Sequence, residues 1–358
     1  MMTTNHIRKV DLKKLRLLSF LSILLFFSCS ESETFNKTSP ENNQENPYSI
    51  GRVGNPENVE VSPKTGVLLM GGSSDVDEAM EWLIEQSDNG DIVIIRVSGG
   101  AAYNQYLYDL GSANSIETLL INSDQAANNE RVAETIREAD ALFIAGGNQA
   151  DYIRFWENSE TEEAIQYLIH EKKVPIGGTS AGSAVMGEFV FSALNGTVTS
   201  EEALSNPFNE RVTVSRSSLV NHPFLAGVLT DQHFSQRDRE GRTTVFLARI
   251  IDQYGYEDEE TAIRAVAVDE RTALSIDENG GMTVFGENSV FFIAPKSDSL
   301  MPEILTPGLP MTWGENEHSM NVYIANDRTD ISYKFNELPE EWSEMWRVSD
   351  GRLIQTVR

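Results

Sequence analysis

The sequence predicts an α/β protein in which helices cover both faces of a mainly parallel sheet. Between residues 66 and 182, short apolar runs that end in glycine alternate with amphipathic stretches. Strands that are apolar throughout are typical of parallel sheets buried on both faces. The chain has 358 residues, 40% of them hydrophobic, which is enough to bury one large core. These patterns favour a three-layer αβα sandwich.

The expected elements follow one another in regular order. Strands are predicted over residues 66–72, 91–100, 116–122, 141–149 and 174–179. Helices are predicted between them over residues 75–86, 128–140 and 160–173. The last of these helices begins with a capping box, formed by Ser159 and Glu162, and carries one apolar stripe. Alternation of this kind indicates βαβ units.

The pattern of apolar and polar residues changes after about residue 262. Residues 262–295 form short apolar runs joined by Asn-Gly and Gly-Glu-Asn turns, which are typical of antiparallel strands. We expect these strands to extend the sheet. Residues 299–358 are rich in proline, tryptophan and acidic side chains, and are predicted to form a small β-rich extension.

The N-terminus indicates export. Five basic residues precede an apolar run that stops at Ser28, so residues 1–28 are predicted to be a signal peptide. Cys29 is the only cysteine, and its place resembles the lipid-attachment site of bacterial lipoproteins. An ordinary secretory signal or an uncleaved anchor is the alternative. Residues 29–63 are polar and are predicted to form a disordered tether between a membrane lipid and the globular part.

Charge and cysteine content exclude several classes of function. The formal net charge is −27, which makes nucleic acid an improbable partner. With Cys29 lipidated, no thiol is left for disulfides, zinc–thiolate sites or cysteine nucleophiles. No spaced cluster of His, Asp and Glu has the pattern of a metal site, so neither a metal nor another cofactor is expected.

Residues 178–182, Gly-Thr-Ser-Ala-Gly, match the G-x-S-x-G nucleophile elbow. In such an elbow small neighbours permit a strained turn that lifts the serine hydroxyl, here that of Ser180, out of the sheet. A plain strand-to-helix turn also favours glycine and serine. The hypothesis of a nucleophile therefore depends on whether a base and an acid accompany the serine.

One histidine and several acids are suitable partners. Of the five histidines only His233 ends an apolar strand, as Ser180 does, although a lone histidine there can also be merely structural. The orienting acid is expected from Asp269 or Glu270, which end the next apolar strand, with Glu201 as the alternative. The resulting order of serine, histidine and acid differs from that of α/β-hydrolases.

Three arginines follow the histidine within six positions: Arg237, Arg239 and Arg242. Cations at the start of a helix oppose its dipole, so they need a partner. Pairing with Asp238 and Glu240 is the structural alternative. We favour a fork for substrate carboxylates, which suits guanidinium geometry, and expect the fold to tolerate its loss.

The segments GGTSAGSAVM, DQHFSQRDREGR, FIAGGNQ and AVDERTAL resemble the cyanophycinase family of serine peptidases, relatives of the aspartyl dipeptidases. The resemblance implies a class I glutamine-amidotransferase-like fold and a catalytic domain over residues 64–298. It also implies an exopeptidase that hydrolyses cyanophycin, or related β-aspartyl peptides, to β-aspartyl-arginine dipeptides. A dipeptidase for other Asp-containing peptides and a non-catalytic surface binding lipoprotein are the alternatives. The oligomeric state is open, with a homodimer among the options.

Carried over residue by residue, the resemblance implies that Ser180 is the nucleophile, His233 its base and Glu270 the orienting acid. It implies an oxyanion hole made by backbone N–H groups of Ala181 and of Gly147 or Asn148. The substrate site would be lined by Gln149, Asp231, Gln232, Arg237, Arg239 and Arg242.

Overall fold

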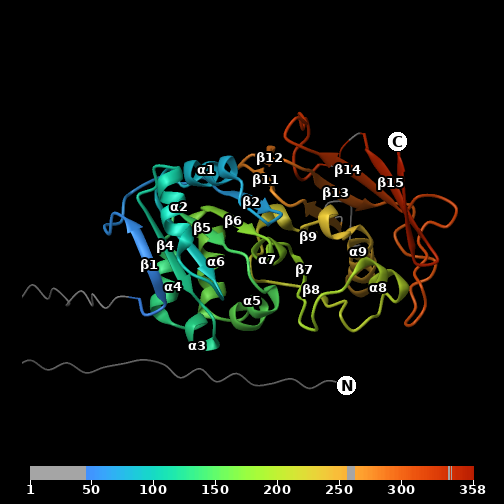
Figure 1. Cartoon of the computed structure of the whole chain (residues 1–358), viewed down its shortest axis with the longest axis horizontal. Coiled ribbons are helices and arrows are strands. Elements are labelled where there is room, and N and C mark those ends of the chain that lie inside the picture. The colour runs from blue at the N-terminus through green and yellow to red at the C-terminus, as the bar shows by residue number, and fades with distance from the viewer. Residues whose placement is uncertain (1–45, 256–262, 338, 340) are drawn as a thin grey trace, which may run out of the picture. The chain divides into compact units, whose positions relative to one another are not determined.

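The computed structural model describes residues 46–255, 263–337, 339 and 341–358. The predicted signal peptide, Cys29 and the first part of the predicted tether lie outside these residues. The described part forms an α/β unit with two mixed eight-stranded sheets (Figure 1).

The first sheet has the predicted parallel centre. Its five central strands are β4 (Ser115–Leu120), β3 (Asp91–Arg96), β5 (Ala141–Ile144), β6 (Pro175–Thr179) and β2 (Gly66–Met70). The antiparallel strands at its edges are β1 (Ser49–Gly54), β11 (Thr272–Ile276) and β12 (Met282–Gly286). Strands β2, β5 and β6 are buried at every position because both faces of the sheet are covered.

Helices pack on both faces of the first sheet, so the αβα layers are present here. Leu68 and Met70 of β2 face the cluster that contains the apolar residues of α1 and α2. Val67 and Leu69 alternate to the opposite cluster, which contains those of α4, α5 and α6. The helices are α1 (Asp77–Gln86), α2 (Ala102–Leu110), α3 (Asp124–Ala127), α4 (Glu130–Glu138), α5 (Gln149–Trp156) and α6 (Glu160–Tyr167), which continues into a π-helical turn, η1 (Leu168–Lys172).

The expectation of a single sheet is wrong. Strands β9 (Val228–Gln232) and β10 (Arg264–Val268) pair in parallel, and β7 (Phe189–Phe191) pairs in parallel with β9, all within a second sheet. Only β11 and β12 of the expected antiparallel strands extend the first sheet. The rest of the second sheet is antiparallel and consists of β8 (Val214–Arg216), β13 (Val290–Pro295), β14 (Met320–Ala325), β15 (Glu344–Ser349) and β16 (Arg352–Val357).

The second sheet is covered by α8 (Ser200–Ser205) and α9 (Glu240–Tyr254) (Figure 1). Apolar residues of α9 share one cluster with Trp313 and Trp346, both fully buried. The C-terminal strands therefore help to cover a helix of the central region. The remaining short elements are α7 (Ala181–Ala184), η2 (Pro223–Leu225) and η3 (Ser235–Arg237). No helix among the described residues has the length and apolar character needed to cross a membrane.

The predicted tether is too long at its C-terminal end. Residues 49–54 form β1, which pairs antiparallel with β4 at the edge of the first sheet. Arg52 reaches from β1 to Ser115 and to the buried Asp91. The composition of this segment is polar, but an edge strand needs few apolar side chains once its backbone is paired.

The two sheets meet at the carboxyl ends of β2, β9 and β10, where Gly71 contacts both His233 and Asp269. Strand β2 lies between β6 and β11 in the first sheet, while β9 lies beside β10 in the second. The chain passes from the second sheet to the first in the turn at residues 269–271, between β10 and β11. Loops at the carboxyl ends of parallel strands are the usual place for a site in such sheets.

Candidate active site

Ser180 sits in a sharp turn between β6 and α7. Its backbone has φ 51° and ψ −120°, a conformation that L residues rarely adopt. The flanking glycines make the turn possible, since a Cβ on Gly178 would lie 2.7 Å from the carbonyl carbon of Gly182. A Cβ on Gly182 would overlap the carbonyl oxygen of Ile144. The predicted elbow is present, with its serine held in a strained geometry.

Ser180, His233 and Glu270 form one hydrogen-bonded chain. Ser180 Oγ lies 2.7 Å from His233 Nε2, and His233 Nδ1 lies 2.7 Å from Glu270 Oε1. The serine comes from the first sheet, the histidine from the end of β9 in the second, and the acid from the turn between the sheets. The three residues that the sequence singled out are therefore brought together in the order that nucleophilic catalysis requires.

The surroundings keep the imidazole uncharged. Burial lowers the pKa of His233 most strongly, the bond to Glu270 raises it, and the charges of Arg237 and Arg239 lower it again, with a net lowering. The hydrogen bond from His233 is the main cause of the lowered pKa of Glu270. A neutral imidazole with Nδ1–H directed at a carboxylate leaves Nε2 free to accept a proton from the serine.

The other two candidate acids have different positions. The buried Asp269 accepts hydrogen bonds from the Ser235 N–H at 2.8 Å and the Ser235 hydroxyl at 2.6 Å, so it fixes the turn after His233. Glu201 is exposed in the first turn of α8. Of the three acids, Glu270 is the one bonded to the histidine.

The three arginines are already paired with two carboxylates of the protein, Asp231 and Glu270. Asp231 accepts two hydrogen bonds from Arg242, at 3.0 Å from Nε and 2.5 Å from Nη2, and lies 3.4 Å from Arg239 Nη1. Arg237 lies 3.4 Å from Glu270. Asp231 and Arg242 are each 2% exposed, and the Arg242 guanidinium lies over the rings of Phe191 and Phe246. The structural alternative, pairing with Asp238 and Glu240, is not seen for these three described arginines.

Ion pairs offset most of the positive charge inside this cluster. Burial opposes ionisation of Asp231, but Arg242, Arg239 and the Thr243 hydroxyl outweigh it, so the pKa of Asp231 is lowered. Burial lowers the pKa of Arg239 to about 10, which leaves it charged at neutral pH. Three guanidinium groups face two paired carboxylates, Asp231 and Glu270, so one positive charge is left over.

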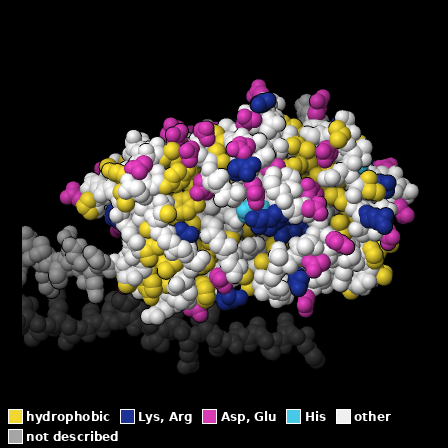
Figure 2. Space-filling model, viewed as in Figure 1, with side chains coloured by type: hydrophobic (Ala, Val, Ile, Leu, Met, Phe, Trp, Pro, Cys, Tyr) yellow, Lys and Arg dark blue, Asp and Glu magenta, His cyan; other side chains and the backbone are white. Residues whose placement is uncertain are grey.

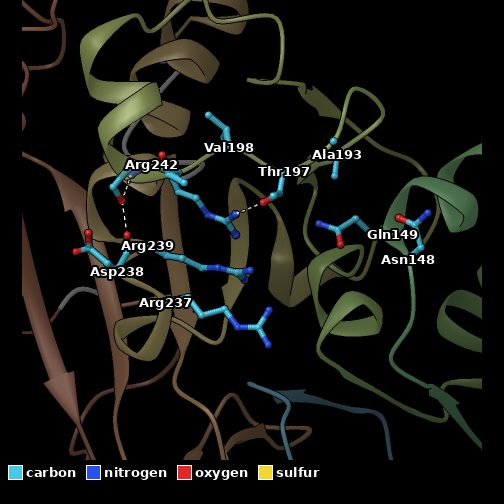
Figure 3. Close-up of a pocket in the computed structure, with 12 residues that line it drawn as sticks. Asn148, Gln149, Ala193, Thr197, Val198, Arg237, Asp238, Arg239 and Arg242 are labelled. Carbon is cyan, nitrogen blue, oxygen red and sulfur yellow. Dashed lines mark hydrogen bonds between the residues drawn. The ribbon is translucent and has the colours of Figure 1, made fainter.

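A pocket of about 410 Å³ opens beside this cluster. Figure 3 shows the three guanidinium groups side by side, pointing toward Asn148 and Gln149 on the opposite wall. The loop at residues 193–200 closes a further side, and Arg242 Nη1 lies 3.4 Å from Thr197 Oγ1 within it. In Figure 2 a group of basic side chains lies beside a histidine, where Figure 1 places β9 and α7.

Two expected substrate contacts do not line this pocket. The Asp231 carboxylate is occupied by Arg242, Arg239 and Thr243. Gln232 is 3% exposed, and its carbonyl oxygen accepts a bond of 2.5 Å from Arg239. Both residues thus lie behind the arginines and are not among the residues that line this pocket. Gln149 does line it, with its amide 3.3 Å from the Phe191 carbonyl.

The loop at residues 146–148 runs alongside the serine. A Cβ on Gly146 would lie 3.4 Å from Ser180 Cβ, and Asn148 caps α5 with its side chain. Ala181 begins α7 directly after the serine. The backbone N–H groups assigned to an oxyanion hole thus belong to the two segments that border Ser180.

Sequence reasoning missed part of the pocket. Thr197, Thr199 and Ser200 line it, and the Ser200 hydroxyl accepts a hydrogen bond from the Arg242 N–H and donates one to the Asp238 carbonyl. Thr199 and Glu202 form a capping box at the start of α8, and this pattern is visible in the sequence. Within the described part of the chain, no cluster of His, Cys, Asp and Glu could hold a metal ion.

An elbow serine bonded to a histidine that is bonded to a carboxylate is the arrangement of a serine-type hydrolase. Comparison with known proteins agrees with this class. The family model of peptidase family S51 matches residues 100–281, just over half of the chain, so the chain belongs to peptidase family S51 and is a serine-type peptidase.

Similar proteins include cyanophycinases. The chain is 26% identical over 200 residues to a cyanophycinase of Synechococcus elongatus, covering 56% of this chain and 55% of that protein. It therefore spans about half the length of this relative. It is 24% identical over 243 residues to a cyanophycinase of Trichormus variabilis, and this match covers 65% of this chain and 74% of that protein. The solved structure of a peptidase from an acI-B1 Actinobacterium is 17% identical, with a TM-score of 0.48 over 76% of this chain and 98% of that one.

Proposed function

We propose that this protein is an exported exopeptidase that hydrolyses cyanophycin or related β-aspartyl peptides to β-aspartyl-arginine dipeptides, on a class I glutamine-amidotransferase-like fold. The observation that carries the catalytic part is the chain of two 2.7 Å contacts from Ser180 through His233 to Glu270. The two relatives described above, which are named cyanophycinase, support the substrate.

In this proposal Ser180 Oγ attacks the scissile carbonyl carbon while His233 Nε2 accepts the hydroxyl proton. The tetrahedral intermediate then breaks its C–N bond, and the imidazolium gives the proton to the leaving amine. Water hydrolyses the acyl-enzyme by the same steps, with the proton passing through His233 again. Glu270 keeps Nδ1 protonated and stabilises the imidazolium, which forms in both halves of the reaction.

The proposed oxyanion hole uses the N–H of Ala181 and that of Gly147 or Asn148. Its support is the position of these groups on the two segments that border Ser180. Donors placed for the transition state, and not for the bound substrate, are worth about 3 kcal/mol each. They account for catalysis beyond what the nucleophile and base supply.

The proposed substrate recognition rests on the arginine pocket. Arg237 is half exposed, and Arg239 keeps one guanidinium edge toward the pocket while the other bonds the protein. A substrate carboxylate would pair with the one arginine charge that Asp231 and Glu270 do not offset. Arg242 has both Nε and Nη2 on Asp231, so its contribution is through Nη1 alone.

The test is turnover of cyanophycin and of a panel of Asp-containing dipeptides, read by mass spectrometry, with Ser180→Ala as the matched inactive variant. We expect β-aspartyl-arginine from cyanophycin with the wild type and none with Ser180→Ala. Products only from α-aspartyl dipeptides would replace the polymer with a dipeptide substrate. Binding without any product would favour the non-catalytic lipoprotein.

Export by residues 1–28 and lipid attachment at Cys29 remain proposals that rest on the sequence pattern alone. Their test is the mass of the mature N-terminus and the membrane fraction of the expressed protein, compared with Cys29→Ser. A lipid on Cys29 in the wild type supports the anchor. An unprocessed N-terminus, or the same distribution for both proteins, overturns it.

A further inference from the structure

Three consecutive backbone carbonyls each hold one segment of the candidate triad. The carbonyl of Met70 accepts the Ser180 N–H at 3.1 Å, and that of Gly71 accepts the His233 N–H at 2.9 Å. The carbonyl of Gly72 accepts the N–H of Arg271, the neighbour of Glu270, at 3.0 Å. The segment 70–72 is therefore bonded to all three segments that carry the serine, the histidine and the acid.

The position of this segment in the sheets explains its reach. It continues β2, which pairs in parallel with the serine strand β6 and antiparallel with β11, the strand that follows the acid. Its bond to His233 crosses from the first sheet to the second. The position of His233 relative to Ser180 therefore depends on this segment.

Neither glycine in the segment has room for a side chain. A Cβ on Gly71 would overlap the carbonyl oxygen of Asp269. A Cβ on Gly72 would lie 2.5 Å from His233 Cε1, 2.7 Å from Nε2 and 2.9 Å from Ser180 Cβ. Gly72 also has φ +89°, in the region that glycine alone adopts freely. The space that Gly72 leaves open is thus next to the atoms between which the serine proton would move.

We propose that residues 70–72 form a positioning strap, in which the carbonyls set the spacing of the triad and the missing side chain of Gly72 lets the imidazole reach Ser180. The strap is a positioning element and takes no part in the chemistry itself. The activity readout of this proposal rests on the proposed function, but the geometric claim can be tested without any substrate.

Substrate kinetics test the strap with a matched control. Gly72→Ala is compared with Gly308→Ala, because Gly308 has a similar φ of +77° and no described atom within 4 Å of its Cβ position. We expect kcat of Gly72→Ala to fall about a hundredfold, the usual effect of a displacement near 1 Å at a reacting group, with KM within about twofold. Gly308→Ala should keep the wild-type kcat. Equal kcat for the two variants would overturn the strap.

A double-mutant cycle on thermal unfolding tests the same contact independently of activity. Gly72→Ala should lower the Tm in the wild-type background, and lower it less in His233→Ala, where the crowded ring is gone. Where Gly72→Ala alone fails to fold, Gly72→Ala with His233→Ala should be the more stable of the two variants, because the crowded ring is gone. An equal Tm penalty in both backgrounds would overturn the strap. A wild type without turnover would overturn only the proposed function.

Discussion

His233 is the residue on which the chemistry depends. Its side chain is 7% exposed. Nε2 is hydrogen-bonded to the Ser180 hydroxyl and Nδ1 to the Glu270 carboxylate, and the charges of two arginines act on the ring. Burial and the arginines outweigh the carboxylate, so the pKa of His233 falls below the ordinary value. The imidazole is therefore a neutral base at neutral pH.

This lowered pKa predicts the pH dependence of the reaction. Because the base must be neutral, kcat/KM should fall on acidification, with a midpoint below the ordinary histidine value of about 6.5. Arg237→Gln removes a charge that lowers the pKa of His233, so the midpoint should move to higher pH. The measurement is kcat/KM against pH for both proteins. A midpoint that stays in place or moves down would contradict the electrostatic account.

Arg242 tests whether the arginine cluster holds the fold as well as the substrate. Removing one member of a buried ion pair typically costs about 3–5 kcal/mol, because the partner stays buried and unpaired. Arg242→Gln should therefore lower the free energy of unfolding strongly, contrary to the sequence-based expectation of an unharmed fold. Arg237→Gln is the control, since Arg237 is 51% exposed. Equal urea midpoints for the two variants would show that the Asp231 pair contributes little.

At the scale of elements, strand ends were predictable from the sequence and pairings were not. Ser180, His233 and Glu270 each follow a short apolar strand, so their convergence at one edge could be expected. The sequence does not reveal which sheet a strand joins, because the β10–β11 turn looks like a hairpin but connects two sheets. The partner of Arg242 was missed because Asp231 lies eleven residues away on a strand.

Strand β1 gives an element-scale prediction. A chain that begins at residue 46 keeps β1. A chain that begins at residue 64 loses the pairing with β4 and the Arg52 contact to Asp91. We expect it to lose at least about 2 kcal/mol, the usual worth of a hydrogen bond to a charged group. Denaturant unfolding measures this difference, and superimposable curves for the chains from 46 and 64 would refute it.

At the scale of the whole molecule, residues 299–358 are part of the apolar core between α9 and the second sheet, and do not form a separate appendage. Trp313 and Trp346 lie in one apolar cluster with Phe246 of α9. The Met311 N–H donates to the Leu204 carbonyl of α8 at 2.9 Å. Because α8 and α9 carry or support the arginine pocket, its shape depends on these C-terminal strands. The sequence of the region, rich in proline and acid, did not reveal this packing.

A chain that ends at residue 298 tests this dependence. It would expose the apolar face of α9 to water, at a cost of about 25 cal/mol per Å² of apolar surface. We expect it to lose cooperative thermal unfolding, and we expect the chain over residues 46–358 to unfold in one transition. Circular dichroism against temperature separates the two. A truncated chain with the same Tm would show that the extension is a separate unit.

The central claim is that His233 activates Ser180, and labelling by a fluorophosphonate tests it most directly, because the reagent reacts only with an activated serine. The wild type should gain one label at Ser180, read by peptide mass spectrometry, at a rate that a chelator leaves unchanged. His233→Ala should react far more slowly, since nucleophile and base act as a unit, while His170→Ala, an exposed histidine on η1, should react like the wild type. A label at another residue, or equal rates for the wild type and His233→Ala, would contradict the account.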